Sequence, residues 1–285
     1  MPSTAEEPSP WQDKKVDSWE VLIKELHDLV EESREENTGG HLRSPYFFRG
    51  MTDASWELKT SLERLDTVSD EVEWPALRAF EKYAPVGTFS RDSEWECLAV
   101  AQHNGLPTRV LDWTSSPLIA AHFATVERPR KKEDVVDGVI WCINHDELRA
   151  ILPDELREEL LNEKAFAYNV PLLDKRYRSL KDFDSVKGID SADVLIFLEP
   201  PSIDARIHNQ YAILSVMNGA SKSHHTYLSE HSFLVRRIVI DSEAKSEIRD
   251  MLDQNNITER MLFPGLPGLC DWLRRYYGLA YSKLK

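Results

Sequence analysis

The sequence predicts an α+β fold in a single domain. Short runs of Val, Ile, Leu and aromatic residues, typical of strands, lie at irregular intervals among segments whose apolar residues recur every three or four positions, as in helices. Such an order does not produce regular strand–helix–strand units. The chain has 285 residues, which is within reach of one hydrophobic core, since cores rarely grow beyond about 250 to 300 residues.

The composition is that of an ordinary globular chain, with 41% hydrophobic and 29% charged residues. The 35 basic and 49 acidic residues give a formal charge of −14. Because cationic contacts to phosphate dominate affinity for nucleic acid, we do not expect a duplex nucleic-acid partner. The one basic run, Arg128–Lys132, is followed at once by Glu133 and Asp134, which favours a solvated loop over a phosphate-binding patch.

No stretch reaches the roughly 20 apolar residues that crossing a bilayer requires. The first ten residues also lack the basic and apolar regions of a signal peptide. We therefore expect a cytoplasmic location and no membrane partner.

Neither the cysteines nor the histidines follow a metal-binding pattern. The cysteines are odd in number, widely separated and without Cys-x-x-Cys spacing, so we expect buried apolar fillers and neither disulfides nor a zinc site. Three histidines near residue 230 lack a carboxylate or Cys at ligand spacing, and we expect a solvated loop there. These residues are Cys97, Cys142 and Cys270, and His224, His225 and His231.

The N-terminal part of the chain begins with residues 1–16, rich in Pro, Ser and Glu, which predict a flexible leader. An amphipathic helix is then expected over Ser18–Ser33. Residues 46–48 form a short aromatic strand closed by Arg49 and Gly50. An Arg at such a strand end is either a packed structural ion or an anion clamp, and the glycine allows another group to approach its backbone closely.

The remaining elements are predicted from the same patterns, and residues 166–188 receive no assignment. Pro153 is expected to divide the long acidic helical segment that follows residue 145. The expected elements are an extended connection over 56–62, helices over 72–84, 93–103, 146–161, 242–255 and 268–276, and strands over 139–143, 194–198, 211–216 and 233–240.

Residues 102–124, QHNGLPTRVLDWTSSPLIAAHFA, carry the most position-specific chemistry. Gly105 and Pro107 predict a turn, residues 109–113 a strand, and Ser116 with Pro117 the start of a helix. The stretch therefore predicts a strand, a polar corner and a helix.

Asp112, Thr114, Ser115 and Ser116 crowd this corner. A strand end and a helix amino terminus can together hold an anionic or hydroxyl-rich ligand. The same residue types are also those that ordinary helix capping requires, so both interpretations remain open.

His103, Arg109 and Trp113 favour the ligand site over simple capping. A buried His, Arg and Asp within ten residues need mutual hydrogen bonds to be tolerated. We therefore predict that Asp112 is ionised and paired with Arg109 or His103.

Four pieces of the chain resemble the pattern of the FRG-domain family, named after its Phe-Arg-Gly motif. They are YFFRGM at 46–51, the stretch at 102–124, RIHNQYAIL at 206–214 and LFPGLPGL at 262–269. The resemblance runs from Trp19 to Tyr276, which implies one FRG domain over residues 17–285.

A second resemblance is to the three-part signature of ADP-ribosyltransferases. An aromatic strand ends in Arg-Gly, a Thr-Ser-Ser corner precedes a helix with Ala-x-Phe, and Asn-Gln-Tyr opens an apolar strand. Arg49 and Gly50 match the first part, Thr114 with Ser115 the second, and Gln210 stands where those enzymes have Glu. The resemblance implies a split β-sheet core with surrounding helices, and NAD as the substrate.

This resemblance also implies roles for individual residues. Arg49, Thr114 and Gln210 would be catalytic. The residues that would bind NAD are Arg49, Gly50, His103, Arg109, Asp112, Trp113 and Ser115.

Gln210 is the main departure from the signature. The Glu of those enzymes stabilises the positive charge that develops as nicotinamide leaves, a contribution of about 3 kcal/mol. Gln210 keeps an acceptor oxygen but loses the charge. Asp112 could replace the missing carboxylate if the fold brings it near, and a structural amide is the other interpretation of Gln210.

Two classes of function remain open. The first is an enzyme that cleaves NAD and transfers ADP-ribose to an unknown acceptor, a protein among the candidates, or to water. The second is a non-catalytic module that binds a nucleotide or a protein. A hydrolase built on His103 and Asp112 is a third and weaker hypothesis. The chain lacks Gly-x-Gly-x-x-Gly and Walker-type sequences, and toxin and phage-defence roles are suggested by analogy alone.

Overall fold

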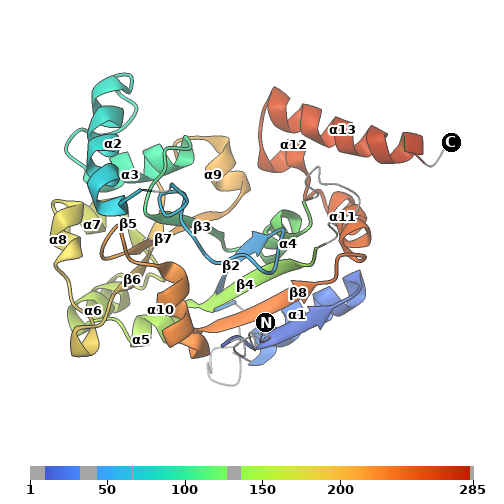
Figure 1. Ribbon diagram of the computed structural model, residues 1–285, viewed down its shortest axis with the longest axis horizontal. Helices are drawn as coiled ribbons and strands as arrows, with labels where there is room; N and C mark the ends of the chain where they lie inside the picture. The colour runs from blue at the N-terminus through green and yellow to red at the C-terminus, as the bar shows by residue number, and fades with distance from the viewer. Residues whose placement is uncertain (1–9, 33–43, 66, 127–135, 283–285) are drawn as a thin grey trace, which may run out of the picture.

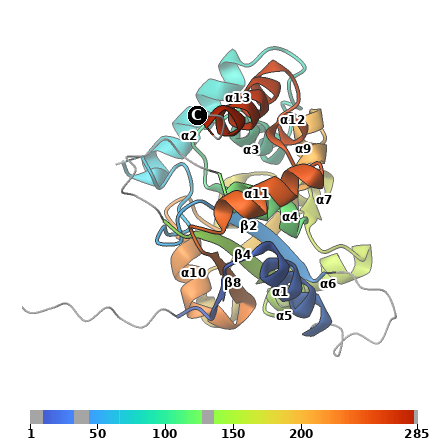
Figure 2. The same ribbon diagram turned by 90° about the vertical axis from the view of Figure 1, so that its right-hand side faces the viewer.

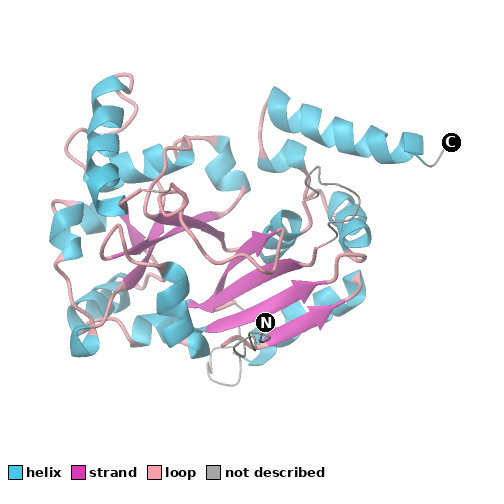
Figure 3. Cartoon of the chain, viewed as in Figure 1, coloured by secondary structure: helices cyan, strands magenta, loops and turns pink. Residues whose placement is uncertain are grey.

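The computed structural model describes residues 10–32, 44–65, 67–126 and 136–282. Its centre is one eight-stranded sheet in the order β1-β8-β4-β2-β3-β7-β6-β5, with helices around it (Figures 1 and 3). The β1–β8 and β5–β6 pairs are parallel and the other pairs are antiparallel, which confirms the α+β class. The strands are β1 (Asp13–Val16), β2 (Tyr46–Met51), β3 (Val110–Thr114), β4 (Gly138–Asn144), β5 (Tyr168–Asn169), β6 (Leu195–Glu199), β7 (Ala212–Met217) and β8 (Val235–Ile240).

The helices cover both faces of the sheet, because alternate residues of the central strands are apolar on both sides. Phe48 packs toward α1, α4 and α11, whereas Phe47 packs toward α10. Figure 2 shows α1 and α10 on opposite sides of β8. The helices are α1 (Trp19–Glu32), α2 (Ser69–Tyr83), α3 (Glu94–His103), α4 (Pro117–Ala124), α5 (His145–Ala150), α6 (Asp154–Glu163), α7 (Val170–Arg176), α8 (Leu180–Asp184), α9 (Ala205–Asn209), α10 (His224–Glu230), α11 (Lys245–Gln254), α12 (Glu259–Leu262) and α13 (Leu266–Ser282).

The sheet is almost divided between β2 and β3. β2 pairs with β4 along its whole length, from Tyr46 to Met51. Its register with β3, in contrast, consists of the single pair Phe48 and Thr114. Beyond this pair the two halves of the sheet diverge, and the backbone of β3 is left facing the Arg49 side chain.

Helix α4 lies against β2 and β4 at backbone distance. A Cβ atom on Gly50 would lie 1.8 Å from the carbonyl oxygen of Ala120, and one on Gly138 would lie 2.3 Å from that of Ala124. Real Cβ atoms do not approach oxygen so closely, so both positions require glycine. The prediction that Gly50 admits a close neighbour is confirmed, and the neighbour is the backbone of α4.

The predicted flexible leader over residues 1–16 is wrong for Asp13–Val16, which form β1 beside β8. Val16 is buried there, and Trp11 contacts Trp141 edge to face with ring centroids 4.9 Å apart. This strand escaped prediction because three of its four residues are polar and exposed. Residues 1–9 lie outside the described part of the chain.

Two further sequence predictions are corrected. The histidines expected in a solvated loop begin and follow α10, and His224 is completely buried. Cys97 and Cys142 are buried as expected, whereas Cys270 is exposed on α13. The basic run at 128–132 lies outside the described residues.

Within residues 10–32, 44–65, 67–126 and 136–282, none of the helices combines the length and apolar character needed to cross a bilayer.

Candidate functional site

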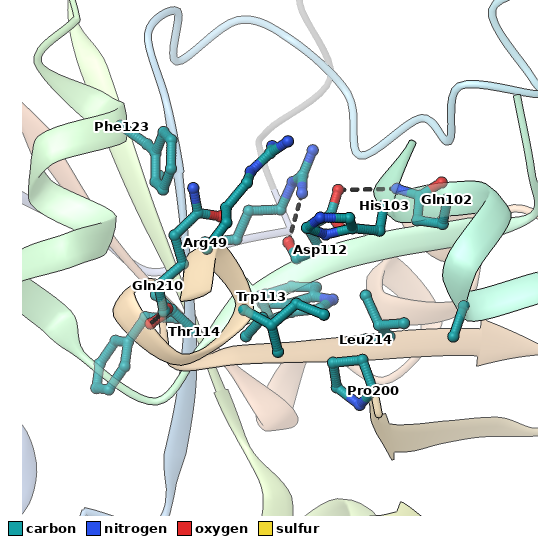
Figure 4. A pocket seen from close by; sticks show the side chains of 16 residues that line it. Arg49, Gln102, His103, Asp112, Trp113, Thr114, Phe123, Pro200, Gln210 and Leu214 are labelled. Carbon is teal, nitrogen blue, oxygen red and sulfur yellow. Dashed lines mark hydrogen bonds between the residues drawn. The ribbon is translucent and has the colours of Figure 1, made fainter. Parts of the chain in front are cut away.

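A cavity of about 250 Å³ opens where β2 and β3 diverge (Figure 4). Its walls come from these two strands, the start of β7, the end of α3 and helix α9. The polar side chains at its wall are those of Arg49, Gln102, His103, Asp112, Thr114, Arg206 and Gln210. From the three-part signature, Arg49, Gly50, Thr114 and Gln210 therefore line one cavity.

Arg49 reaches across the gap between the two strands and donates from Nη1 to the carbonyl oxygen of Asp112. Its Nε is buried and has no hydrogen-bond partner among the described residues. Within the same residues, no carboxylate forms a salt bridge with it. Burial lowers the pKa of Arg49, the Asp112 charge opposes this, and the Arg64 charge adds to the lowering. A partly buried guanidinium whose Nε lacks a partner is suited to an anion that arrives from outside.

Asp112 is held by a relay of two side chains. The Thr108 hydroxyl donates to Oε1 of Gln102 over 2.5 Å, so the amide nitrogen of Gln102 must point the other way. That nitrogen donates to Oδ2 of Asp112 over 2.8 Å, as the dashed line in Figure 4 shows. Oδ1 has no hydrogen bond within the described part of the chain. The relay thus presents one carboxylate oxygen to the cavity.

The predicted cluster of His103, Arg109 and Asp112 is wrong, because the three side chains point to different partners. His103 Nε2 lies 2.6 Å from Oδ2 of Asp204, at the start of α9. The charge of Asp112 instead acts on Arg49, whose pKa it raises against the effect of burial.

Arg109 lies in the interior on the far side of β3. Its Nε donates to Oε2 of Glu73 over 2.7 Å, and its Nη2 donates to Asp184 over 3.2 Å. Burial opposes the charge of Arg109, but the hydrogen bonds and charges of these two carboxylates outweigh it and raise the pKa. Arg109 does not line the cavity, and its role is to hold α2 and α8 against the sheet.

The polar corner is organised by Thr114. Its hydroxyl donates to the carbonyl oxygen of Gln210 over 2.7 Å and accepts from the amide of Ser116 over 3.0 Å. Ser116 makes no side-chain cap on α4, so the capping interpretation is wrong for this residue. Ser115 is exposed, and its amide bonds to the carbonyl oxygen of Tyr211.

Gln210 and Trp113 each use a polar side-chain group for structure. Gln210 Nε2 donates to the carbonyl oxygen of Leu262 over 3.0 Å, which ties the end of α9 to α12. The indole nitrogen of Trp113 donates to Ser215 over 2.8 Å inside the core. Both residues also line the cavity, but neither supplies a charge to it.

A second cavity, of about 800 Å³, adjoins the first at Arg49, Gly50 and Phe123. It lies between β2, α4 and α13, the helix that Figure 1 shows apart from the sheet. His122 lines it as a neutral side chain, because burial and the nearby Arg249 lower its pKa to about 3. No group of three potential metal ligands occurs among the residues that the structure describes.

Three residues that the sequence analysis did not single out complete the site. Thr108 orients the relay, Asp204 fixes His103, and Arg206 places its guanidinium 5.2 Å from the ring centroid of Phe263. Arg206 lies in the motif at residues 206–214, but the motif does not show where the Arg206 side chain points. Asp204 lies 101 residues from His103 in the sequence, and Thr108 lies 6 residues from Gln102 but in a different element. No local pattern reveals these partners.

Residues 44–133 match the family model described as the FRG domain. The chain carries an FRG domain over these residues. The matched part of the FRG domain contains β2, α2, α3, β3 and α4, and so supplies Arg49, Asp112 and the relay. Gln210 and the walls formed by α9, α12 and α13 lie beyond it. Comparison with curated proteins and with solved structures gives no match.

Proposed function

We propose that this FRG-domain protein cleaves NAD at the nicotinamide and passes ADP-ribose to an acceptor or to water. The observation that carries the proposal is the partly buried guanidinium of Arg49, whose buried Nε has no hydrogen-bond partner and which has no carboxylate partner among the described residues, facing the cavity beside Asp112. The positive group suits the diphosphate of NAD, and the carboxylate suits the charge that develops on its ribose.

The fold offers a second support. The three parts of the ADP-ribosyltransferase signature lie on β2, at the end of β3 and at the end of α9, directly before β7. The strands β2, β3 and β7 are neighbours in the sheet. The sheet is joined there by one residue pair. An ADP-ribosyltransferase-like core, split at this point, is therefore part of the proposal.

In the proposed reaction, the bond between C1′ of the nicotinamide ribose and the ring nitrogen breaks, and its electron pair leaves with neutral nicotinamide. The acceptor then bonds to C1′ and releases a proton, so hydrolysis yields ADP-ribose. Asp112 faces the positive charge that develops at C1′ and takes the place of the missing Glu. Gln102 and Thr108 hold Asp112 in position, while Thr114 and Gln210 shape the wall.

The alternative, a non-catalytic module that binds a nucleotide, is favoured by one observation. The amide of Gln210 is engaged with the carbonyl oxygen of Leu262, so its donor group is not available to a ligand. A pocket of this kind would use Arg49 for binding without chemistry.

Release of nicotinamide from NAD tests the proposal. It should be measured for the wild type, Asp112→Asn and the matched control Asp92→Asn, which removes an exposed carboxylate remote from both cavities. Each protein is assayed with and without cell lysate as a source of acceptors. Turnover that falls about 100-fold or more in Asp112→Asn and stays normal in Asp92→Asn is expected. Saturable NAD binding without turnover in the wild type would establish the binding module instead.

A further inference from the structure

The larger cavity is positively charged although the chain as a whole carries −14. Five arginines and two acidic residues line it. They are Arg49, Arg64, Arg249, Arg274 and Arg275, with Glu259 and Asp271. A local excess of positive charge against an acidic background concentrates anionic ligands.

Two of these arginines are already neutralised. Arg275 donates to both oxygens of Asp253, over 2.8 and 2.6 Å, and to both oxygens of Glu259, each over 2.8 Å. Arg249 is paired with the same Glu259. This network holds α11, α12 and α13 together, and it leaves no charge for a ligand.

Arg49 and Arg64 differ from this pair. Neither has a salt bridge among the described residues, and the charge of Arg64 is close enough to contribute to the lowered pKa of Arg49. Two like charges that face one cavity without a carboxylate between them repel each other. A diphosphate placed between them would remove the repulsion and supply two acceptors for Arg49. Arg274 can add a third contact, since its pairing with Asp271 is on the surface and weak.

The same cavity has aromatic walls. Phe123 and Phe263 meet edge to face, with ring centroids 6.1 Å apart, and Trp56 also lines the space. All three rings are partly exposed. Partly exposed rings beside arginines are the surfaces on which nucleic-acid bases stack.

We propose that the larger cavity is the subsite for the nucleoside diphosphate half of the substrate. Its phosphates lie between Arg49 and Arg64, and its base lies against Phe263 and Phe123. This inference rests on the proposed function, in which the smaller cavity beside Asp112 takes the reacting ribose. The volumes suit this division, because about 800 Å³ accommodates a nucleotide and about 250 Å³ only a smaller group.

Calorimetric titration with ADP, adenosine and pyrophosphate tests the subsite independently of catalysis. The variants are Arg64→Ala, Phe263→Leu and the control Arg178→Ala, which removes an equally exposed arginine outside both cavities. ADP should bind the wild type and Arg178→Ala alike. Arg64→Ala should weaken ADP binding at least about tenfold and adenosine binding little. Phe263→Leu should weaken ADP and adenosine but not pyrophosphate.

The outcomes separate this inference from the proposed function. ADP binding that responds to both variants supports the subsite even if NAD is never cleaved. Cleavage of NAD that ADP does not inhibit, with Arg64→Ala behaving as the wild type, would overturn the subsite and leave the reaction standing. Pyrophosphate binding as tightly as ADP, with no effect of Phe263→Leu, would overturn the nucleotide assignment in favour of a phosphorylated protein segment.

Discussion

Arg109 is buried and Arg49 is partly buried, and replacing each by Met should have opposite consequences. Arg109 is enclosed by Glu73 and Asp184. Arg49 has one hydrogen bond, to the carbonyl oxygen of Asp112, and a buried Nε without a partner among the described residues. We predict that Arg49→Met keeps the fold and loses the ligand, whereas Arg109→Met loses the fold.

The magnitudes follow from what each substitution leaves behind. Arg109→Met strands two carboxylates near the core, and breaking a buried pair in this way costs about 3 to 5 kcal/mol of unfolding free energy. Arg49→Met forfeits one hydrogen bond from a charged donor, about 1.5 to 3 kcal/mol. It also removes the desolvation cost of a partly buried charge, which is smaller than that of a fully buried ion. These two contributions oppose each other. The free energy of unfolding of Arg49→Met should therefore lie within about 1 kcal/mol of the wild-type value, or above it.

Urea unfolding monitored by circular dichroism gives both free energies, and calorimetric titration with NAD gives binding for the variants that fold. Arg49→Met should bind NAD at least about 100-fold more weakly, because it removes a charged bidentate donor worth roughly 3 kcal/mol. An Arg49→Met protein that is destabilised by 3 kcal/mol or more and still binds NAD would refute this reasoning. Arg49 would then be a structural ion.

Three further predictions follow from the described contacts. Gly50→Ala should destabilise the fold by about 3 kcal/mol or more in the same unfolding assay, because its Cβ would collide with the carbonyl oxygen of Ala120. The control is Gly278→Ala, whose Cβ would meet no neighbouring atom within 4 Å. Its stability should equal that of the wild type or be slightly higher. Gln210→Glu should not accelerate nicotinamide release, because it replaces the amide that donates to the carbonyl oxygen of Leu262 by an anion. The loss of this hydrogen bond should cost about 1 to 3 kcal/mol of unfolding free energy. A faster release would show that the signature carboxylate works at this position. Burial lowers the pKa values of His122 and His224 to about 3, below the unfolded value of roughly 6.5. As the pH falls, the unfolded chain therefore takes up these protons before the folded chain does. The free energy of unfolding should decrease as the pH drops from about 6.5 toward 3. Each histidine contributes about 1.4 kcal/mol per pH unit, and His224→Leu should halve this part of the slope.

The local pattern of the sequence predicted the central corner well. The helix preferences of Ser116 and Pro117 and the apolar run before them are local effects, and β3 and α4 form where expected. The direction of the side chains was also contained in the sequence. Arg109 and Asp112 are separated by an odd number of strand positions, so they face opposite sides of the sheet and cannot pair. The predicted cluster overlooked this alternation.

Other features depend on contacts between distant parts of the chain. β1 has little apolar character of its own and exists because β8 offers an unpaired edge. The relay from Thr108 through Gln102 to Asp112 depends on how α3 meets β3. The division of the sheet beside Arg49 arises from the divergence of two strands that lie about 60 residues apart. No periodicity in the sequence encodes these arrangements.

Calorimetric titration of NAD into the wild-type protein and into Arg49→Met tests the central claim most directly. The structure predicts saturable binding of one NAD per chain in the wild type, and binding at least about 100-fold weaker in Arg49→Met at similar or higher stability. Equal affinity in the two proteins, or no binding to the wild type, would contradict the assignment of this cavity to NAD.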